Sequence, residues 1–157
     1  MKTKANLAHL SINSAKGKKF GIVRSVWNDA ITKRLYDGCY NTLLKHGAIK
    51  EHIKTLEVPG SFELIYGGKK MAKESDIDSV IVIGSIIKGE TPHFDFISQS
   101  VTNGIKDLNI LFEIPFVFCV LTDLNQNQAI NRSGGKIGNK GVEAALTAIT
   151  LINNSIY

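Results

Sequence analysis

The chain has 157 residues, of which 43% are hydrophobic and 21% charged, and its formal net charge is +5. This balance fits one globular domain with a core of its own, and no apolar run reaches the roughly 18 residues of a membrane span. The N-terminus lacks the apolar stretch of a signal peptide, so we expect a cytoplasmic protein with a single domain over residues 1–157, of which 1–17 form an extended basic tail.

Strand-like and helix-like runs alternate along the chain. The apolar strands are expected at 20–25, 53–58, 79–86 and 114–122, and the helices at 28–47, 61–75, 92–108, 125–132 and 139–154. Short, continuously apolar strands separated by helices predict a parallel sheet covered on both faces. The expected fold is therefore a three-layer α/β/α sandwich around a four-stranded parallel sheet, of the flavodoxin-like kind.

Charge and cysteine content exclude some classes of function. The basic surplus permits nucleic-acid binding, but no zinc-finger or RNA-binding signature is present, and we favour a solvated tail without a nucleic-acid partner. Cys39 and Cys119 are too few for a disulfide framework and lie in apolar runs, so they are predicted to be buried thiols. The histidines and the "HFD" triplet are too sparse for a metal site.

Function in folds of this kind gathers where the parallel strands end. The third strand runs into "KGETPH", in which Thr91 is predicted to cap the next helix and Pro92 to be its first residue. His93 then lies in the first turn, where free amides and the helix dipole favour an anion and a neutral imidazole. Gly89 allows close approach of a ligand. We interpret the stretch as an anion site beside a proton-transfer group; a surface histidine at a helix start is the alternative.

Three other strand ends carry candidate groups. Trp27 follows the first strand and either stacks on a planar ring or belongs to the core. Ser61 and Glu63 follow the second and either bind hydroxyls or cap a helix. Arg132 and Lys136 flank a glycine pair beyond the fourth, and their charges suit a phosphate or, alternatively, a solvated turn. The segment does not fit a P-loop.

Five blocks, in this order and spacing, resemble the 6,7-dimethyl-8-ribityllumazine synthase family. They are "FGIVRSVWNDAITKRLYDG", "VPGSFEL", "GSIIKGETPHFDFIS", "FVFCVLT" and "NRSGGKIGNKGVEAA". The resemblance implies a transferase that condenses 5-amino-6-(D-ribitylamino)uracil with 3,4-dihydroxy-2-butanone 4-phosphate, the penultimate step of riboflavin biosynthesis. An imine forms, phosphate leaves and the ring closes with loss of water, with neither a metal nor an organic cofactor.

The resemblance also implies roles for individual residues. Trp27 would stack on the pyrimidine, residues 61–63 would hold the ribityl chain, and His93 would transfer the proton. Within one subunit the substrate-binding residues would be Trp27, Ser61, Phe62, Glu63, Ser85, Ile86, Ile87, Glu90 and Thr91. A carboxylate repels phosphate, so the Glu90 side chain is expected to point away while its backbone N–H faces the ligand.

The family assembles into pentamers, and in some members twelve pentamers form an icosahedral shell. The resemblance therefore implies active sites shared between neighbours, with Phe118, Arg132 and Lys136 supplied by the adjacent subunit. The short segment between the last two helices favours a shell, and riboflavin synthase is an open candidate partner.

Rival functions predict other features. A flavodoxin-like flavin module would have a glycine- and hydroxyl-rich loop after the first strand, and a response-regulator receiver an aspartate ending the third. A non-catalytic assembly protein or nucleic-acid binder would show no turnover.

Overall fold

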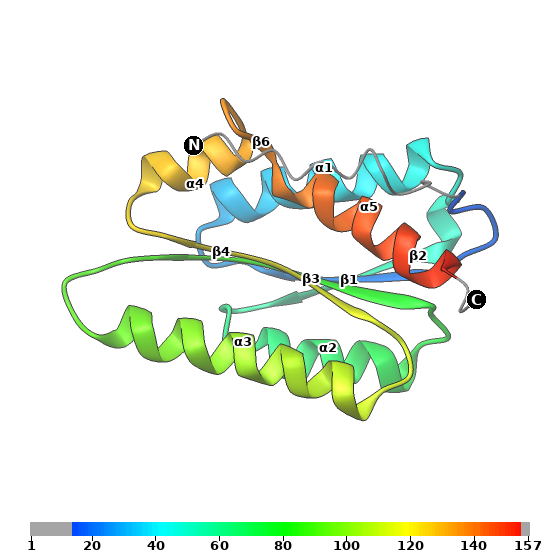
Figure 1. Cartoon of the computed structure of the whole chain (residues 1–157), viewed down its shortest axis with the longest axis horizontal. Helices are drawn as coiled ribbons and strands as arrows, with labels where there is room; N and C mark the ends of the chain where they lie inside the picture. Colours follow the sequence, from blue (N-terminus) through cyan, green and yellow to red (C-terminus); the bar gives the residue numbers. More distant parts are fainter. Residues whose placement is uncertain (1–13, 155–157) are drawn as a thin grey trace.

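The computed structural model describes residues 14–154, so residues 1–13 of the expected tail lie outside the described part. The elements, shown in Figure 1, are β1 (Phe20–Ser25), α1 (Asp29–Lys45), a 3-10 turn η2 (Lys50–His52), β2 (Ile53–Val58), α2 (Leu64–Glu74), β3 (Ser79–Ile87), α3 (His93–Leu111), β4 (Phe116–Asp123), α4 (Gln126–Arg132), β5 (Ser133–Gly135), β6 (Gly138–Asn139) and α5 (Lys140–Asn153).

The central sheet has four parallel strands in the order β2-β1-β3-β4. Helices α1, α4 and α5 cover one face and α2 and α3 the other, as Figure 1 shows. The three-layer α/β/α prediction is thereby confirmed. This topology leaves β2 and β4 as the two edges of the sheet and brings the carboxyl ends of β1, β2 and β3 together.

Alternate strand residues supply the two cores of the domain. Ile22, Ile81 and Ile83 pack toward α1 and α5, whereas Val23 and Val82 pack toward α2 and α3. All five side chains have 0% exposure, and each stabilises the fold by about 1.5–3 kcal/mol relative to an exposed position. Burial on both faces explains why these strands are continuously apolar in the sequence.

Gly67 and Gly68 lower the intrinsic helix propensity of α2, yet the helix runs through both. A Cβ added at Gly67 would lie 2.7 Å from Val23 Cγ1 and 2.9 Å from Val58 Cγ1. Close packing of α2 on the sheet therefore requires glycine there, and tertiary contact outweighs local propensity.

The start of α3 differs from the prediction by one residue. The helix begins at His93, and the Pro92 carbonyl accepts the first helical bond from the Phe96 N–H at 3.3 Å. No side chain caps it, so the predicted capping role of Thr91 is wrong. The cap position lies one residue beyond the threonine, because Pro92 already has right-handed helical dihedrals and closes the turn with its own carbonyl.

Residues around the first strand are more ordered than a solvated basic tail suggests. Ala15 is buried, and its N–H donates to the His46 carbonyl at 2.8 Å. Lys19 pairs with Asp76. Within residues 14–154, the tail prediction is therefore wrong for Ala15, because the end of α1 gives that residue a packing partner.

Candidate active site

A cleft of about 540 Å³ lies at the carboxyl ends of β1, β2 and β3. Its lining residues are Trp27, Gly60, Ser61, Phe62, Glu63, Ser85, Ile86, Ile87, Gly89, Thr91, His93, Phe94 and Ile97. Of the candidates expected within one subunit, all line this cleft except Glu90, which is exposed. The topology thus brings three separate sequence blocks to one place.

Trp27 stands at the rim of the cleft with 71% of its surface exposed, so it is not a core aromatic. Its backbone is nevertheless fixed. The Val26 and Trp27 N–H groups donate to the carbonyls of Val58 and Pro59 at 2.9 and 3.0 Å, which extends the pairing of β1 with β2 beyond the last strand residue. The indole is therefore presented from a rigid backbone as a free aromatic face.

The turn after β2 presents polar groups without using them as helix caps. The Glu63 carboxylate accepts the Gly60 N–H at 2.9 Å, and α2 begins at Leu64 with no side-chain cap. Ser61 is 7% exposed and lies against β3, where a Cβ on Gly84 would come within 2.7 Å of its Oγ. The glycine in β3 therefore makes room for the serine at the cleft.

The end of β3 and the start of α3 form the opposite wall. His93 is exposed in the first turn of α3 and lines the cleft. Asp95 lies in the same turn and partly offsets the positive helix end. A Cβ at Gly89 would meet no atom within 4 Å, so this loop leaves open space for a ligand.

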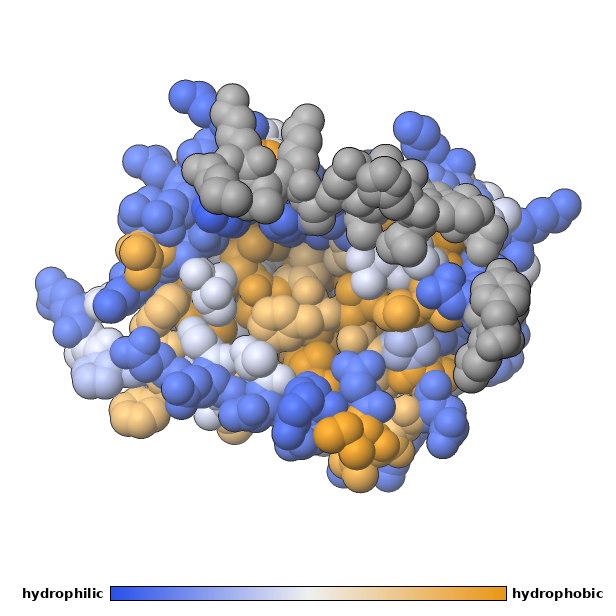
Figure 2. Space-filling model, viewed as in Figure 1, coloured by the Kyte–Doolittle hydropathy of each residue, from blue (hydrophilic) through white to orange (hydrophobic). Residues whose placement is uncertain are grey.

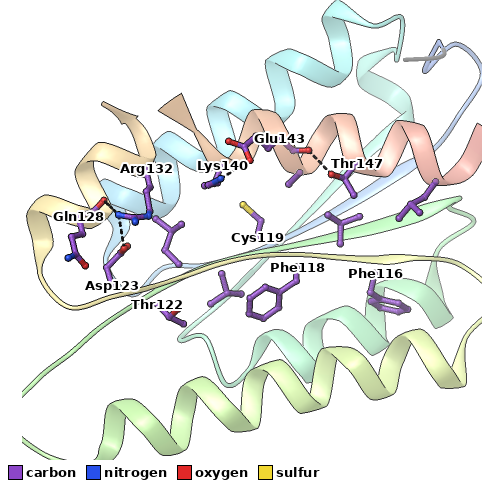
Figure 3. Close-up of a pocket in the computed structure, with 15 residues that line it drawn as sticks. Phe116, Phe118, Cys119, Thr122, Asp123, Gln128, Arg132, Lys140, Glu143 and Thr147 are labelled. Carbon is purple, nitrogen blue, oxygen red and sulfur yellow. Dashed lines mark hydrogen bonds and ion pairs between the residues drawn. The ribbon is translucent and has the colours of Figure 1, made fainter. Parts of the chain in front are cut away.

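A second hollow, of about 620 Å³, runs along the exposed edge of β4 beneath α4 and α5 (Figure 3). Phe118 and Arg132 line it, whereas Lys136 is exposed and does not. Neither Phe118 nor Arg132 lines the cleft that holds Trp27 and His93. Within one chain, the predicted site residues therefore divide into two groups.

Arg132 is held at the end of this hollow by acceptors from two elements. The Nη1 atom of Arg132 lies 3.4 Å from Asp123 Oδ1 and 3.5 Å from the Gln128 carbonyl oxygen (Figure 3). Asp123 is only 3% exposed. Burial raises the pKa of its carboxyl group, and the charge of Arg132 opposes that rise. The arginine has a weak internal partner and keeps 36% of its side chain exposed, so it can engage an anion.

The hairpin β5–β6 follows Arg132 and was not expected from the sequence. Gly134 and Gly138 adopt φ angles of +118° and +105°, which favour glycine. Asn139 then ties the hairpin to α1, because its Nδ2 donates to the Arg34 carbonyl at 2.9 Å and to the Ser133 carbonyl at 3.3 Å. The cationic end of α4 is thus anchored to the body of the domain.

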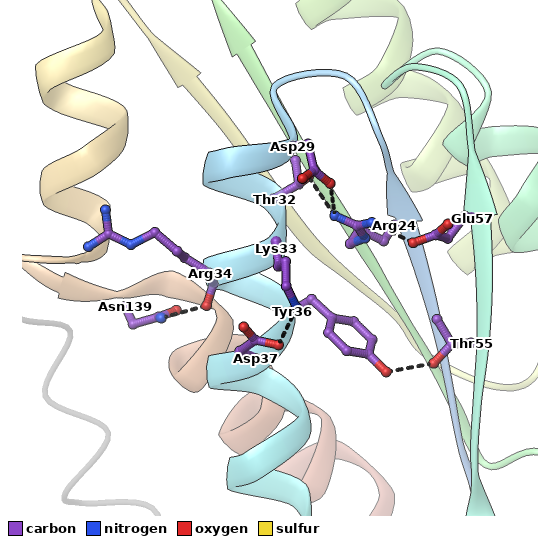
Figure 4. A network of polar contacts seen from close by, with 10 residues as sticks. All are labelled: Arg24, Asp29, Thr32, Lys33, Arg34, Tyr36, Asp37, Thr55, Glu57 and Asn139. Carbon is purple, nitrogen blue, oxygen red and sulfur yellow. Dashed lines mark hydrogen bonds and ion pairs between the residues drawn. The ribbon is translucent and has the colours of Figure 1, made fainter.

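A polar cluster that sequence reasoning missed is centred on Arg24. Arg24 in β1 pairs with Asp29 at 2.6 Å and with Glu57, its neighbour across the β1–β2 register (Figure 4). Its side chain is 10% exposed. The signal available in the sequence was a cation inside an apolar strand, which requires partners.

Within residues 14–154, no group of three potential metal ligands is present, and no helix has the length and apolar character needed to cross a bilayer.

Comparison with known proteins gives a consistent family. The sequence model of 6,7-dimethyl-8-ribityllumazine synthase matches residues 17–155. A protein of that name from Flavobacterium johnsoniae is 55% identical over 141 residues, covering 90% of this chain and 74% of the relative. Relatives of the same name from Bacteroides fragilis and Parabacteroides distasonis are 51% and 46% identical, covering 86% and 96% of this chain and 94% and 96% of their own.

Proposed function

Because this chain belongs to the 6,7-dimethyl-8-ribityllumazine synthase family, we propose that the cleft at the ends of β1, β2 and β3 is its active site. The chain is a transferase of riboflavin biosynthesis, which condenses 5-amino-6-(D-ribitylamino)uracil with 3,4-dihydroxy-2-butanone 4-phosphate. The observation that carries the assignment of the site is the convergence of an exposed indole, a polar turn and an exposed imidazole on one cleft.

The roles of the cleft residues follow from their exposure and chemistry. Trp27 offers a free aromatic face on which the pyrimidine stacks. The groups of Ser61, Phe62 and Glu63 hold the ribityl chain, and Ser85, Ile86 and Ile87 form the wall beside the ring. His93 moves the proton during imine formation and ring closure, because it is the titratable imidazole on the wall of the cleft.

Among residues 14–154, neither a lysine nor an arginine lines this cleft, so the cations that bind the phosphate are expected from elsewhere. We propose that Arg132, together with Lys136 and the ring of Phe118, comes from a neighbouring subunit and completes the site around Thr91 and the Glu90 N–H. A bidentate guanidinium suits a phosphate well, and Arg132 is only weakly held by Asp123.

A homopentamer is the proposed assembly, because a head-to-tail ring lets each subunit offer one face to the next and another to the previous one. The unpaired edge of β4 supports it. Figure 2 shows apolar side chains gathered across the middle of the view, where Figure 1 places β4. Phe118 in β4 is 40% exposed. Exposed apolar surface of this kind marks an interface.

Three finer proposals remain to be tested by other means. Twelve pentamers would form a shell, which electron microscopy of the purified protein resolves directly. Riboflavin synthase would be a partner, which co-purification tests. The enzyme would act in the cytoplasm, which its two free buried thiols support.

The activity is tested by mixing both substrates with the purified protein and following lumazine fluorescence. We expect product to form far faster than in the protein-free mixture. Turnover equal to that spontaneous rate would refute the function.

Sharing of the site is tested by complementation. The impaired variants His93→Ala and Arg132→Ala are co-refolded, so that some interfaces pair an intact His93 with an intact Arg132. Mixed rings are expected to exceed the residual activity of either parent refolded alone, because some of their sites are intact. Mixed rings, verified by mass spectrometry, that show no more activity than the parents would place both residues in one chain's site.

A further inference from the structure

Asn28 has an unusual backbone conformation directly beside the proposed aromatic platform. Its φ and ψ are 56° and 46°, and within residues 14–154 no other non-glycine residue has a positive φ. Asparagine tolerates this left-handed region better than most residues, but the conformation is still disfavoured. The turn from β1 into α1 therefore holds a conformation that something else must stabilise.

The side chain of Asn28 does not cap the helix that begins after it. Asn28 is the N-cap of α1, and its carbonyl accepts the N–H groups of Ile31 and Thr32 at 2.9 and 3.1 Å. An asparagine there normally also accepts an N–H through its side chain, as Asn125 does for α4. Asn28 makes no such bond. Its Nδ2 instead donates to the carbonyl of Ser85 in β3 at 2.9 Å.

This bond ties β1 to β3 where their backbone pairing has already ended. The register of the two strands stops at Arg24 and Ile83. On its other side, the same turn is held by the Trp27 N–H on the Pro59 carbonyl. The turn is thus fastened to β2 by a backbone bond and to β3 by the Asn28 amide.

These two hydrogen bonds lie on either side of the turn that carries Trp27, and the bond from Asn28 reaches the cleft wall at the end of β3. Trp27 is 71% exposed, so the turn's backbone rather than core packing sets where its ring stands. Ser85 begins the wall that continues through Ile86 and Ile87. Asn28 itself does not line the cleft. We propose that Asn28 is a positioning residue, whose amide fixes the spacing between the Trp27 ring and the wall that begins at Ser85.

This inference rests on the proposed function for the identity of its ligand. One of its two measurements, made on the unliganded protein, does not depend on that function. Trp27 is the only tryptophan, so the anisotropy of its fluorescence in the unliganded protein reports how firmly the ring is held. Quenching of the same fluorescence by added 6,7-dimethyl-8-ribityllumazine reports affinity.

Two variants remove the amide donor in different ways. Asn28→Gly suits the positive φ and removes the side chain. Asn28→Asp keeps the shape, places a favourable charge at the N-terminus of α1, and sets an oxygen that cannot donate against the Ser85 carbonyl. Ala30→Gly is the matched control, because it weakens the exposed first turn of α1 and leaves the amide bond intact.

Both Asn28 variants should show lower Trp27 anisotropy and about tenfold weaker lumazine binding, the most that one hydrogen bond of this kind supplies. The KM of the pyrimidine should rise, while that of the butanone phosphate stays close to wild type. Ala30→Gly should match wild type in every measurement.

Wild-type anisotropy and affinity in the two Asn28 variants would overturn the proposal, and so would an equal loss in Ala30→Gly. If Asn28→Gly fails to fold, Asn28→Asp decides alone. Absence of lumazine binding in the wild type would instead refute the proposed function, while the anisotropy still tests the role of Asn28.

Discussion

Gly141 lies at a close approach between α1 and α5, and its replacement tests that packing. A Cβ added there would lie 1.9 Å from the Leu35 carbonyl oxygen and 2.7 Å from its carbonyl carbon, whereas real Cβ contacts essentially never fall below 3.0 Å. The obstacle is backbone, so no rotamer change relieves it. Gly141→Ala therefore requires the two helices to separate locally by about 1 Å.

Two opposing effects set the size of the change. Alanine gains up to about 1 kcal/mol of helix propensity over glycine, and less at the second residue of a helix. Overpacking in a well-packed interior costs about 1–3 kcal/mol and occasionally more. Because a carbonyl cannot yield as a side chain can, we expect a net loss of about 3 kcal/mol, which lowers the Tm of a chain of this size by about 6–12 °C.

The assay is thermal unfolding followed by circular dichroism, at equal protein concentration and with the assembly state checked by size-exclusion chromatography. Gly89→Ala is the matched control, since a Cβ there meets no atom within 4 Å, and its Tm should stay close to wild type. Equal Tm values for wild type and Gly141→Ala would refute the packing argument.

Further predictions concern the reaction and the thiols. His93→Ala should slow turnover by roughly one to four powers of ten with the assembly intact, and an unchanged kcat would exclude His93 from the mechanism. Arg132→Ala should raise the KM of the butanone phosphate far more than that of the pyrimidine, because it removes a charge-assisted contact; equal losses would indicate a structural role. Burial raises the pKa of the Cys119 thiol to about 12 and that of Cys39 well above its usual value of 9.0, so a thiol reagent at pH 8 should label neither until the protein unfolds. Labelling of the native protein would contradict this burial. The thiols of the unfolded chain ionise at lower pH than those of the folded chain, so the free energy of unfolding should fall as pH rises above 9.0 toward about 12.

The sequence was sufficient where structure depends on local pattern. The first two strands occur at the predicted residues, 20–25 and 53–58. The first is buried along its whole length, whereas the second is an edge strand in which only Ile53 and Val58 are buried.

Parallel topology gathers the carboxyl ends of strands, and this predicted that Trp27, Ser61 and His93 lie near one another, as their shared cleft shows. Residues 85–87 were expected there only through the family resemblance.

Features that depend on pairing between distant segments were not predictable. The salt bridge of Arg24 with Glu57 arises from the β1–β2 register, and the bond from Asn28 to Ser85 from the neighbouring pair β1 and β3. The hairpin β5–β6 is two to three residues per strand, too short for any alternation to be seen. In each case the sequence showed the residue, but it did not show which distant residue would become its partner.

The candidate site residues are divided between two hollows of one chain, and this division affects how much activity remains when intact and defective chains assemble together. If neighbouring subunits share each site as proposed, a chain that lacks both His93 and Arg132 would disable the site it hosts and the site it completes for its neighbour. In a cell that makes intact and doubly defective chains equally, only about a quarter of the sites would be whole if assembly is random, rather than half. An allele of this kind would therefore act as partly dominant, whereas an allele that merely prevents folding would be recessive.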